Sequence, residues 1–230
     1  MPSLVGSEMC IRDRFNLKNN KTKVLIIGDS HSKDLFNFFK TNEKKFENYE
    51  FARYGINLID LKNYRKKNLI SSHNFKHANY ILFSQRYKKK DLVNLQKLIE
   101  LSNQNQKKLV IFLKRPEFAS NNNKNQTILD LFYLINEKIL SKKLMDSFFY
   151  DQLKPKNFIP INEEILEEYK DQAVFYDLYP IFCDNNKSSC HSIDQNGKKI
   201  FYDYGHLTLD GSRYIGNILF DSKFHTNYLK

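Results

Sequence analysis

Two short segments of this 230-residue chain combine residue types that can carry out nucleophilic chemistry. The first is Gly-Asp-Ser-His at 28–31, which follows an apolar run and precedes a helical pattern. A turn at Gly28 can lift the Ser30 hydroxyl into solvent beside the free N–H groups of a helix start, and such donors can stabilise an oxyanion. The alternative is structural, because Asp29 or Ser30 can simply cap the helix.

The second segment is Asp-Tyr-Gly-His at 203–206, which places a carboxylate three residues before an imidazole. A tight turn lets Asp203 accept from one ring nitrogen of His206, leaving the other nitrogen free to take a proton from Ser30. Serine is a weak nucleophile without such a base. A cap or a satisfied histidine is again the alternative. The two segments together favour a catalytic triad.

The elements that must position these segments alternate between strands and helices, which predicts a parallel sheet covered on both faces. In such a sheet ligands bind beyond the carboxyl ends of the strands, where segment 28–31 is expected. We predict one domain over 15–230, a three-layer α/β/α sandwich. The expected strands are 23–27, 49–54, 79–84, 109–113 and 173–176, and the expected helices are 32–40, 91–102, 127–140 and a last one from 210 or 211.

Length and composition are those of one globular domain. A chain of 230 residues suits one α/β domain and is short for two. With 41% apolar and 14% aromatic residues it can build a hydrophobic core. No apolar run approaches the ~18 residues of a membrane span.

The net charge of +11 raises the question of a nucleic-acid partner. Only seven of the 37 basic residues are Arg, and the basic clusters lie beside helical patterns, where they are most simply solvated faces. No recognition motif accompanies them. We therefore expect no nucleic-acid partner, whereas an acidic glycan is compatible with the charge.

Residues 1–14 are expected not to be native. The stretch 3–14 looks like the translation of a transposase adaptor used in sequencing-library preparation, and such scars are excluded from fold reasoning. On this interpretation the native N-terminus is missing, and Cys10 does not count among the protein's cysteines.

The remaining cysteines, Cys183 and Cys190, have six residues between them in a polar stretch. This spacing favours a disulfide and an oxidising compartment. One alternative is a pair of unrelated thiols in a cytosolic protein. A zinc site with His191 is disfavoured because no second ligand pair has the right spacing.

The end segments resemble the SGNH hydrolase superfamily, whose first block is seen at 24–31 and whose last is seen at 202–212. More narrowly, the chain looks like the SGNH domain at the C-terminal end of membrane acyltransferases that O-acetylate bacterial surface polysaccharides. That subgroup has Pro-Glu after a strand, here at 116–117, and a Cys pair before the Asp-x-x-His block.

The resemblance implies roles for the two segments. Ser30 would be the nucleophile, His206 the general base and Asp203 the residue that orients it. The Ser30 N–H would be one oxyanion donor and Gly55 the second.

The third oxyanion donor of the superfamily departs from its usual form. It is usually Asn in a Gly-x-Asn pattern after the third strand, where this chain has Ser-Gln-Arg-Tyr at 84–87. Gln85 can donate in its place, Arg86 can bind an anionic substrate, or neither does so.

The function implied is O-acetyl transfer to, or ester hydrolysis on, a bacterial cell-surface polysaccharide through an acyl-enzyme. The expected partners are a carbohydrate acceptor, an acyl donor and an upstream membrane acyltransferase domain, with no metal or organic cofactor. The implied location is the periplasm or cell envelope, tethered to the membrane, with the cytoplasm as the alternative. Rival interpretations are a non-catalytic glycan- or partner-binding domain of this fold and a free lysophospholipase-like esterase.

Overall fold

The computed structural model describes residues 14–229 apart from 63–64, 120–129 and 131–140. The predicted helix 127–140 therefore lies outside the described residues except at position 130. Residues 1–13 of the segment interpreted as an adaptor also lie outside them.

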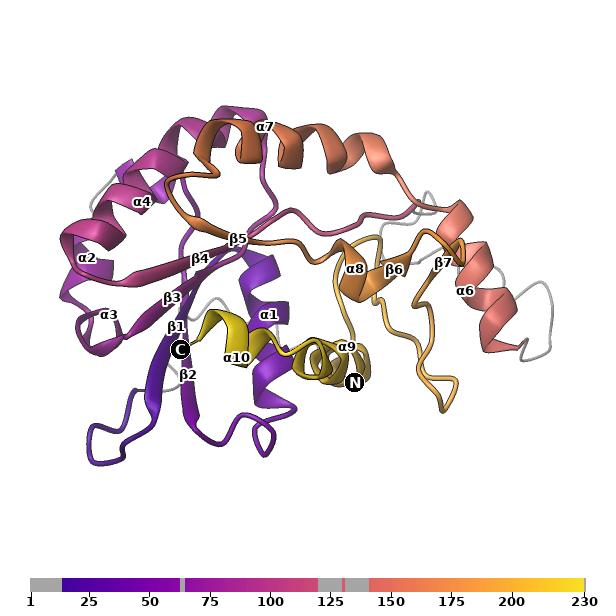
Figure 1. The fold of residues 1–230 in the computed structure, drawn as a ribbon, viewed down its shortest axis with the longest axis horizontal. Coiled ribbons are helices and arrows are strands. Elements are labelled where there is room, and N and C mark those ends of the chain that lie inside the picture. The colour runs from indigo at the N-terminus through magenta and orange to yellow at the C-terminus, as the bar shows by residue number, and fades with distance from the viewer. Residues whose placement is uncertain (1–13, 63–64, 120–129, 131–140, 230) are drawn as a thin grey trace.

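The described chain is built around a five-stranded sheet in which every neighbouring pair is parallel, with strand order β2-β1-β3-β4-β5 (Figure 1). The predicted parallel sheet is confirmed, and each strand end lies within one residue of its expected position. The strands are β1 (Thr22–Gly28), β2 (Tyr49–Gly55), β3 (Tyr80–Phe83), β4 (Lys108–Phe112) and β5 (Val174–Tyr176).

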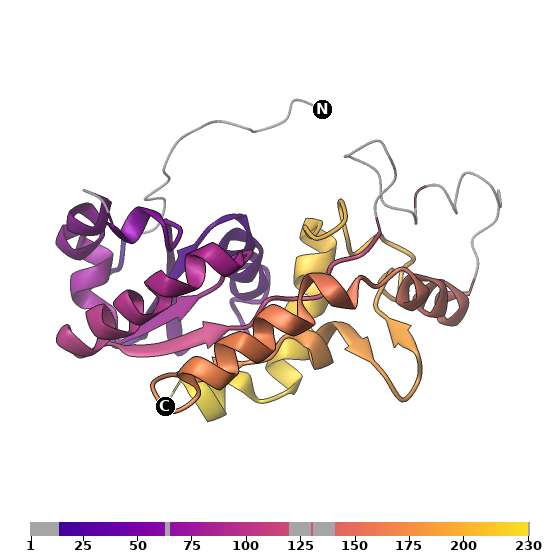
Figure 2. The same ribbon diagram turned by 90° about the horizontal axis from the view of Figure 1, so that it is seen from above.

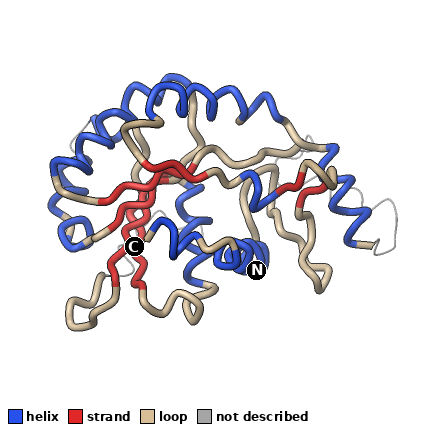
Figure 3. Tube along the Cα trace, in the orientation of Figure 1, coloured by secondary structure: helices blue, strands red, loops and turns tan. Residues whose placement is uncertain are grey.

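Helices cover both faces of the sheet, which confirms the three-layer fold (Figure 3). Successive side chains of a strand point to opposite faces. Val24 and Ile26 of β1 accordingly join one hydrophobic cluster, and Leu25 and Ile27 join the other. A strand buried on both faces is apolar along its buried length, as β1 is over residues 24–27. The first cluster includes α1 (Ser30–Lys40), α6 (Lys142–Asp151), α8 (Tyr179–Phe182), α9 (Leu209–Asp221) and α10 (Phe224–Tyr228), and the second includes α2 (Arg65–Ser71), α3 (His73–His77), α4 (Leu95–Gln104) and α7 (Ile159–Tyr169).

Several helices begin or divide at other residues than expected, in two cases because a side chain caps the helix. Helix α1 begins at Ser30 rather than at 32, because the Asp29 side chain caps it. The expected helix 91–102 is divided into a 3-10 helix, η2 (Lys89–Asn94), and α4. Thr208 caps α9, which begins at Leu209, one residue before the expected start. Two shorter 3-10 helices are η1 (Asp60–Lys62) and η3 (Pro155–Asn157).

Helices α6, α7 and α8 and a small hairpin were not among the expected elements. The hairpin pairs β6 (Cys183–Asp184) with β7 (Ser189–Cys190), and together with α6 it lies at the end of the molecule away from β2 (Figure 2). None of the helices within the described ranges is long and apolar enough to span a bilayer.

The end of β1 makes a close backbone approach that only glycine allows. Gly28 has a φ of +140°, and a Cβ placed on it would lie 1.8 Å from the carbonyl oxygen of Ser84. The Ser84 N–H donates to Ile27 O at 3.0 Å, so the loop after β3 is held against this point. Any side chain at 28 would push the two loops apart.

We expect Gly28→Ala to lower the free energy of unfolding by more than about 3 kcal/mol, because it adds a clash to an unfavourable φ. Gly197→Ala is the matched control, since Gly197 also has a positive φ, +76°, but no atom within 4 Å of the added Cβ. The control should lose about 1 kcal/mol. Urea unfolding measures both values, and equal losses would contradict the packing explanation.

Candidate active site

Ser30 is the first residue of α1 and its side chain is exposed. The Asp29 carboxylate accepts the N–H of His31 at 2.9 Å and so serves as the helix cap. The cap and the reactive serine suggested by the sequence are therefore two neighbouring residues, and Ser30 is left available for other contacts.

Ser30, His206 and Asp203 meet although 176 positions separate the serine from the histidine. The Nε2 atom of His206 lies 2.9 Å from Ser30 Oγ, and its Nδ1 atom lies 2.7 Å from Asp203 Oδ2. The other carboxylate oxygen of Asp203 accepts the N–H groups of Gly205 at 2.9 Å and His206 at 2.7 Å. This tight turn fixes the imidazole with one nitrogen on each partner, the arrangement that lets a histidine take a serine proton.

Asp203 is kept ionised by this turn. Burial pushes its pKa upward, but the hydrogen bonds from the His206 ring and from two backbone N–H groups outweigh burial, so the pKa of Asp203 lies below its usual value. Because folding lowers this pKa, the carboxylate stabilises the folded state above the usual aspartate pKa. That stabilisation is lost as the pH falls through the lowered value.

A second histidine stands next to the first. His31 is buried, and its ring centroid lies 5.9 Å from that of His206 in an edge-on contact. Burial lowers the pKa of His31 well below 6.5, and the positive charges of Arg115 and Arg86 lower it further. His31 is therefore neutral at neutral pH and adds no cation beside His206.

The residues expected to form the rest of an oxyanion hole lie at the same edge of the sheet. Gly55 ends β2 and pairs in register with Gly28. Gln85 is buried, and its side-chain oxygen accepts the N–H of Leu58 at 3.0 Å. The loop after β3 is thereby tied to the loop after β2, and the Gln85 amide is held by its oxygen.

Arg86 is fixed beside the turn that carries His206. Its backbone N–H donates to Asp29 Oδ2 at 3.0 Å. Its guanidinium donates to both carboxylate oxygens of Glu117, at 2.8 and 3.2 Å, and to the hydroxyl of Tyr204. It also lies 4.8 Å from the centroid of the Tyr204 ring, a cation–π distance. About 39% of the Arg86 side chain is exposed, so this fixed cation faces solvent next to the triad.

Glu117 is the anchor of this arrangement and was not predicted as a site residue. It is 1% exposed, and it accepts from Asn157 Nδ2 at 3.1 Å and pairs with Lys114 at 3.5 Å. The N–H of the next residue, Phe118, donates to Tyr204 O at 3.0 Å, which ties the segment to the His206 turn. Pro-Glu was recognised only as a subgroup feature, and no sequence spacing connects it with Arg86.

The cysteine pair forms a disulfide, Cys183–Cys190, that joins β6 to β7. Among the residues that the structure describes, no group of three or more His, Cys, Asp or Glu side chains is placed to hold a metal ion.

Comparison with known proteins identifies relatives of this chain. A family model for the SGNH domain (fused to AT3 domains) matches residues 4–221. The structure is similar to the periplasmic domain of a lipopolysaccharide acetyltransferase from Salmonella ser. Paratyphi A, with a TM-score of 0.61 and 16% identity over 90% of this chain and 85% of that one. It is also similar to a GDSL-like lipase from Bacteroides thetaiotaomicron, with a TM-score of 0.50 and 13% identity over 93% and 92% of the two chains. No curated protein matches the chain.

We expect Glu117→Gln to lower the free energy of unfolding by about 2–3 kcal/mol, because it leaves the buried Lys114 and the half-exposed Arg86 without their counter-charge. Glu43→Gln is the matched control. Glu43 pairs with Lys40 at 3.4 Å on the surface, where such a pair contributes less than about 1 kcal/mol. Chemical denaturation of both variants checks the difference, and equal losses would show that Glu117 is no anchor.

Proposed function

Because the chain belongs to the SGNH domain family and is thus an enzyme of acyl transfer or ester hydrolysis, we propose that it acts through a serine acyl-enzyme on O-acetyl groups of a bacterial cell-surface polysaccharide. The observation that carries this proposal is the pair of hydrogen bonds from the His206 ring to Ser30 and to Asp203. Together they provide a nucleophile, a base and a charge that holds the base in place.

In the first half of the reaction Ser30 Oγ attacks the carbonyl carbon of an acetyl ester while its proton passes to His206 Nε2. The resulting oxyanion collapses, the ester C–O bond breaks, and the leaving alkoxide takes the proton from His206. Asp203 balances the positive imidazole throughout. The product is an acetyl group on Ser30 and a free alcohol.

In the second half an acceptor hydroxyl gives its proton to His206 and attacks the acetyl carbon. The bond from that carbon to Ser30 Oγ then breaks, and Oγ takes the proton back from His206. If the acceptor is a sugar, the product is an acetylated glycan; if it is water, the product is acetate. Both routes restore Ser30 and use the same three residues. The balance between them depends on access of water relative to the sugar.

The proposed oxyanion donors are the N–H of Ser30 at the start of α1, the N–H of Gly55 and the side chain of Gln85. The first N–H groups of a helix have no partner within it, and the ends of β1 and β2 lie side by side. The proposed role of Arg86 is to bind an anionic group of the substrate, because its guanidinium is both fixed and half exposed.

A polysaccharide substrate is supported by the exposure of Ser30, since an open site admits a polymer. The similarity to the periplasmic domain of a lipopolysaccharide acetyltransferase agrees with this substrate class. We further propose a location in the periplasm or cell envelope, in keeping with the disulfide, and attachment to a membrane acyltransferase domain of the AT3 kind.

The first test is intact-mass analysis of the chain from Phe15 onward after treatment with a fluorophosphonate. The wild type should gain one adduct, Ser30→Ala and His206→Ala should gain none, and Asp203→Asn should react at least about 100-fold more slowly because its base is no longer oriented. Ser188→Ala, in the exposed β6–β7 turn, is the control and should label as the wild type does.

A folded wild type without an adduct would overturn the catalytic proposal and favour the non-catalytic binding domain. An adduct that persists in Ser30→Ala would place the nucleophile elsewhere.

A further inference from the structure

A cleft opens at the carboxyl edge of the sheet, beyond β4 and β5. Its volume of about 520 Å³ lies within the range of small-molecule sites. Leu113, which follows β4, and Asp177, which follows β5, both line it. Neighbouring strands are about 4.8 Å apart, and β5 is three strands from β1, so the cleft lies roughly 14 Å along this edge from Ser30.

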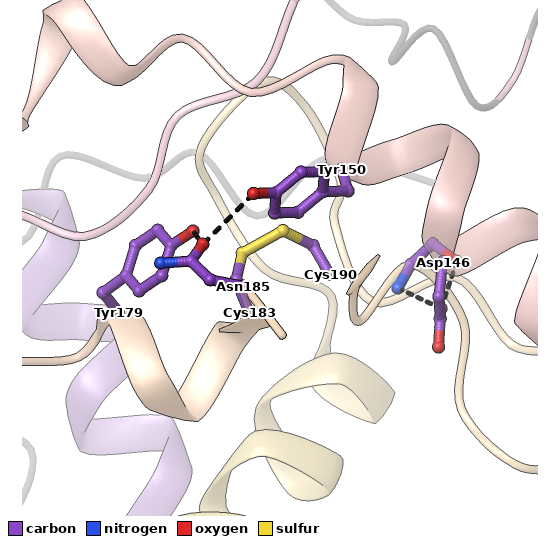
Figure 4. Close-up of a disulfide and its surroundings, with 7 residues drawn as sticks. Asp146, Tyr150, Tyr179, Cys183, Asn185 and Cys190 are labelled. Atoms are coloured by element: carbon purple, nitrogen blue, oxygen red, sulfur yellow. Dashed lines mark hydrogen bonds between the residues drawn. A yellow bond between two sulfur atoms is a disulfide. The ribbon is translucent and has the colours of Figure 1, made fainter. Parts of the chain in front are cut away.

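Two tyrosines and an amide define one wall of this cleft, which we call the aromatic cleft. The hydroxyls of Tyr150 on α6 and Tyr179 on α8 both donate to Oδ1 of Asn185, as Figure 4 shows. The Tyr179 ring also stacks on Phe158 with centroids 5.9 Å apart. The nearby disulfide closes the hairpin that carries Asn185, so three separate elements fix this wall.

The polar atoms that remain available are suited to hydroxyl groups. The Asn185 Nδ2 donor makes no hydrogen bond with the described residues. Asp177 accepts the N–H of Tyr179 at 2.8 Å through Oδ1, which leaves Oδ2 as an acceptor. Flat apolar rings combined with one amide donor and one carboxylate acceptor fit a pyranose, which has apolar C–H faces and a rim of hydroxyls.

The charge of the cleft restricts which sugars fit. Asp177 and Glu163 both line it, and no Lys or Arg is among its lining residues. Asp177 is exposed, so its carboxylate can be reached by a ligand, and partial desolvation raises its pKa. An anionic sugar would be repelled here, although the chain as a whole carries +11.

A series of contacts connects this cleft with the loop that carries His206. Leu113 and Phe158 of the cleft are the chain neighbours of Lys114 and Asn157, and those two residues contact Glu117. Glu117 in turn holds Arg86 beside the His206 turn. A chain of sugars lying along this edge would pass over fixed protein atoms from one site to the other.

We propose that the aromatic cleft binds an uncharged pyranose residue of the acceptor glycan, several sugars away from the hydroxyl that is acetylated. This assignment of the acceptor class rests on the proposed function, but binding at the cleft needs no catalysis. The two are therefore tested separately.

The test is NMR-detected binding of three hexasaccharides to Ser30→Ala protein, which cannot turn over. The probes are cellohexaose and maltohexaose, which are neutral, and hexagalacturonate, which is anionic. At least one neutral hexamer should bind with a Kd of about 10 mM or tighter and shift the resonances of the cleft residues, whereas hexagalacturonate should shift those resonances less. Binding by neither neutral hexamer, or larger shifts of the cleft resonances with the anionic one, overturns the proposal.

Matched variants locate the site. Tyr179→Ala and Asn185→Ala should each weaken binding of the neutral hexamer, about tenfold for the tyrosine, while Asn186→Ala and Tyr228→Ala should not. Asn186 is the exposed neighbour in the same turn, and Tyr228 lies at the amino edge beside the starts of β4 and β5. Because Asn185 is exposed, its variant reports on binding even where loss of the tyrosine affects folding.

Loss of binding in the control variants as well would overturn the location. Glycan binding without a fluorophosphonate adduct on the wild type would overturn the proposed function and leave the cleft in place. An adduct on the wild type without glycan binding would overturn the cleft alone.

Discussion

The carboxylate of Asp29 is the contact on which the rest of the candidate site depends. One of its oxygens accepts the N–H of His31 and starts α1, and the other accepts the N–H of Arg86 after β3. The backbone oxygen of Asp29 accepts a hydrogen bond from the guanidinium of Arg53, a residue of β2, at 3.0 Å. The loops after β1 and β3 and strand β2 are thereby joined by one residue, and Ser30 occupies the next position in the chain. The placement of the serine is thus a consequence of backbone geometry rather than of contacts to its own side chain.

The buried charges around Glu117 fix the segment next to this residue as well. Glu117 and Lys114 are buried and Glu117 also pairs with the half-exposed Arg86, and buried charges are costly unless they are paired and hydrogen-bonded. Bonds from Asn157 and from the backbone of the adjoining segment complete the cluster. Such a network has little freedom to shift, because movement of any member leaves a buried charge unsatisfied. The Arg86 cation and the turn carrying His206 therefore share one rigid support.

The sequence predicted those parts of the molecule that depend on local patterns. Strands β1, β3 and β4 follow from apolar runs, and the meeting of Ser30 with His206 follows from two segments whose turns are closed by their own side chains, Asp29 and Asp203. The Arg86–Glu117–Tyr204 cluster joins positions 31 and 118 residues apart, and such contacts depend on the relative placement of three loops. The aromatic cleft was missed because α6, α7 and α8, which were not predicted, supply half of its lining residues.

An exposed serine has a consequence for how transfer and hydrolysis compete. Ser30 is open to solvent, so water can reach an acyl group on it as readily as a sugar can. A sugar hydroxyl reacts faster than water only when another part of the same glycan is bound to the protein. Such binding raises the effective concentration of the hydroxyl near the serine. On the proposed function, a polymer held in the aromatic cleft roughly 14 Å away supplies that gain. The ratio of transfer to hydrolysis would then rise with acceptor length, because a sugar too short to span the two sites meets the acyl-enzyme with no advantage over water.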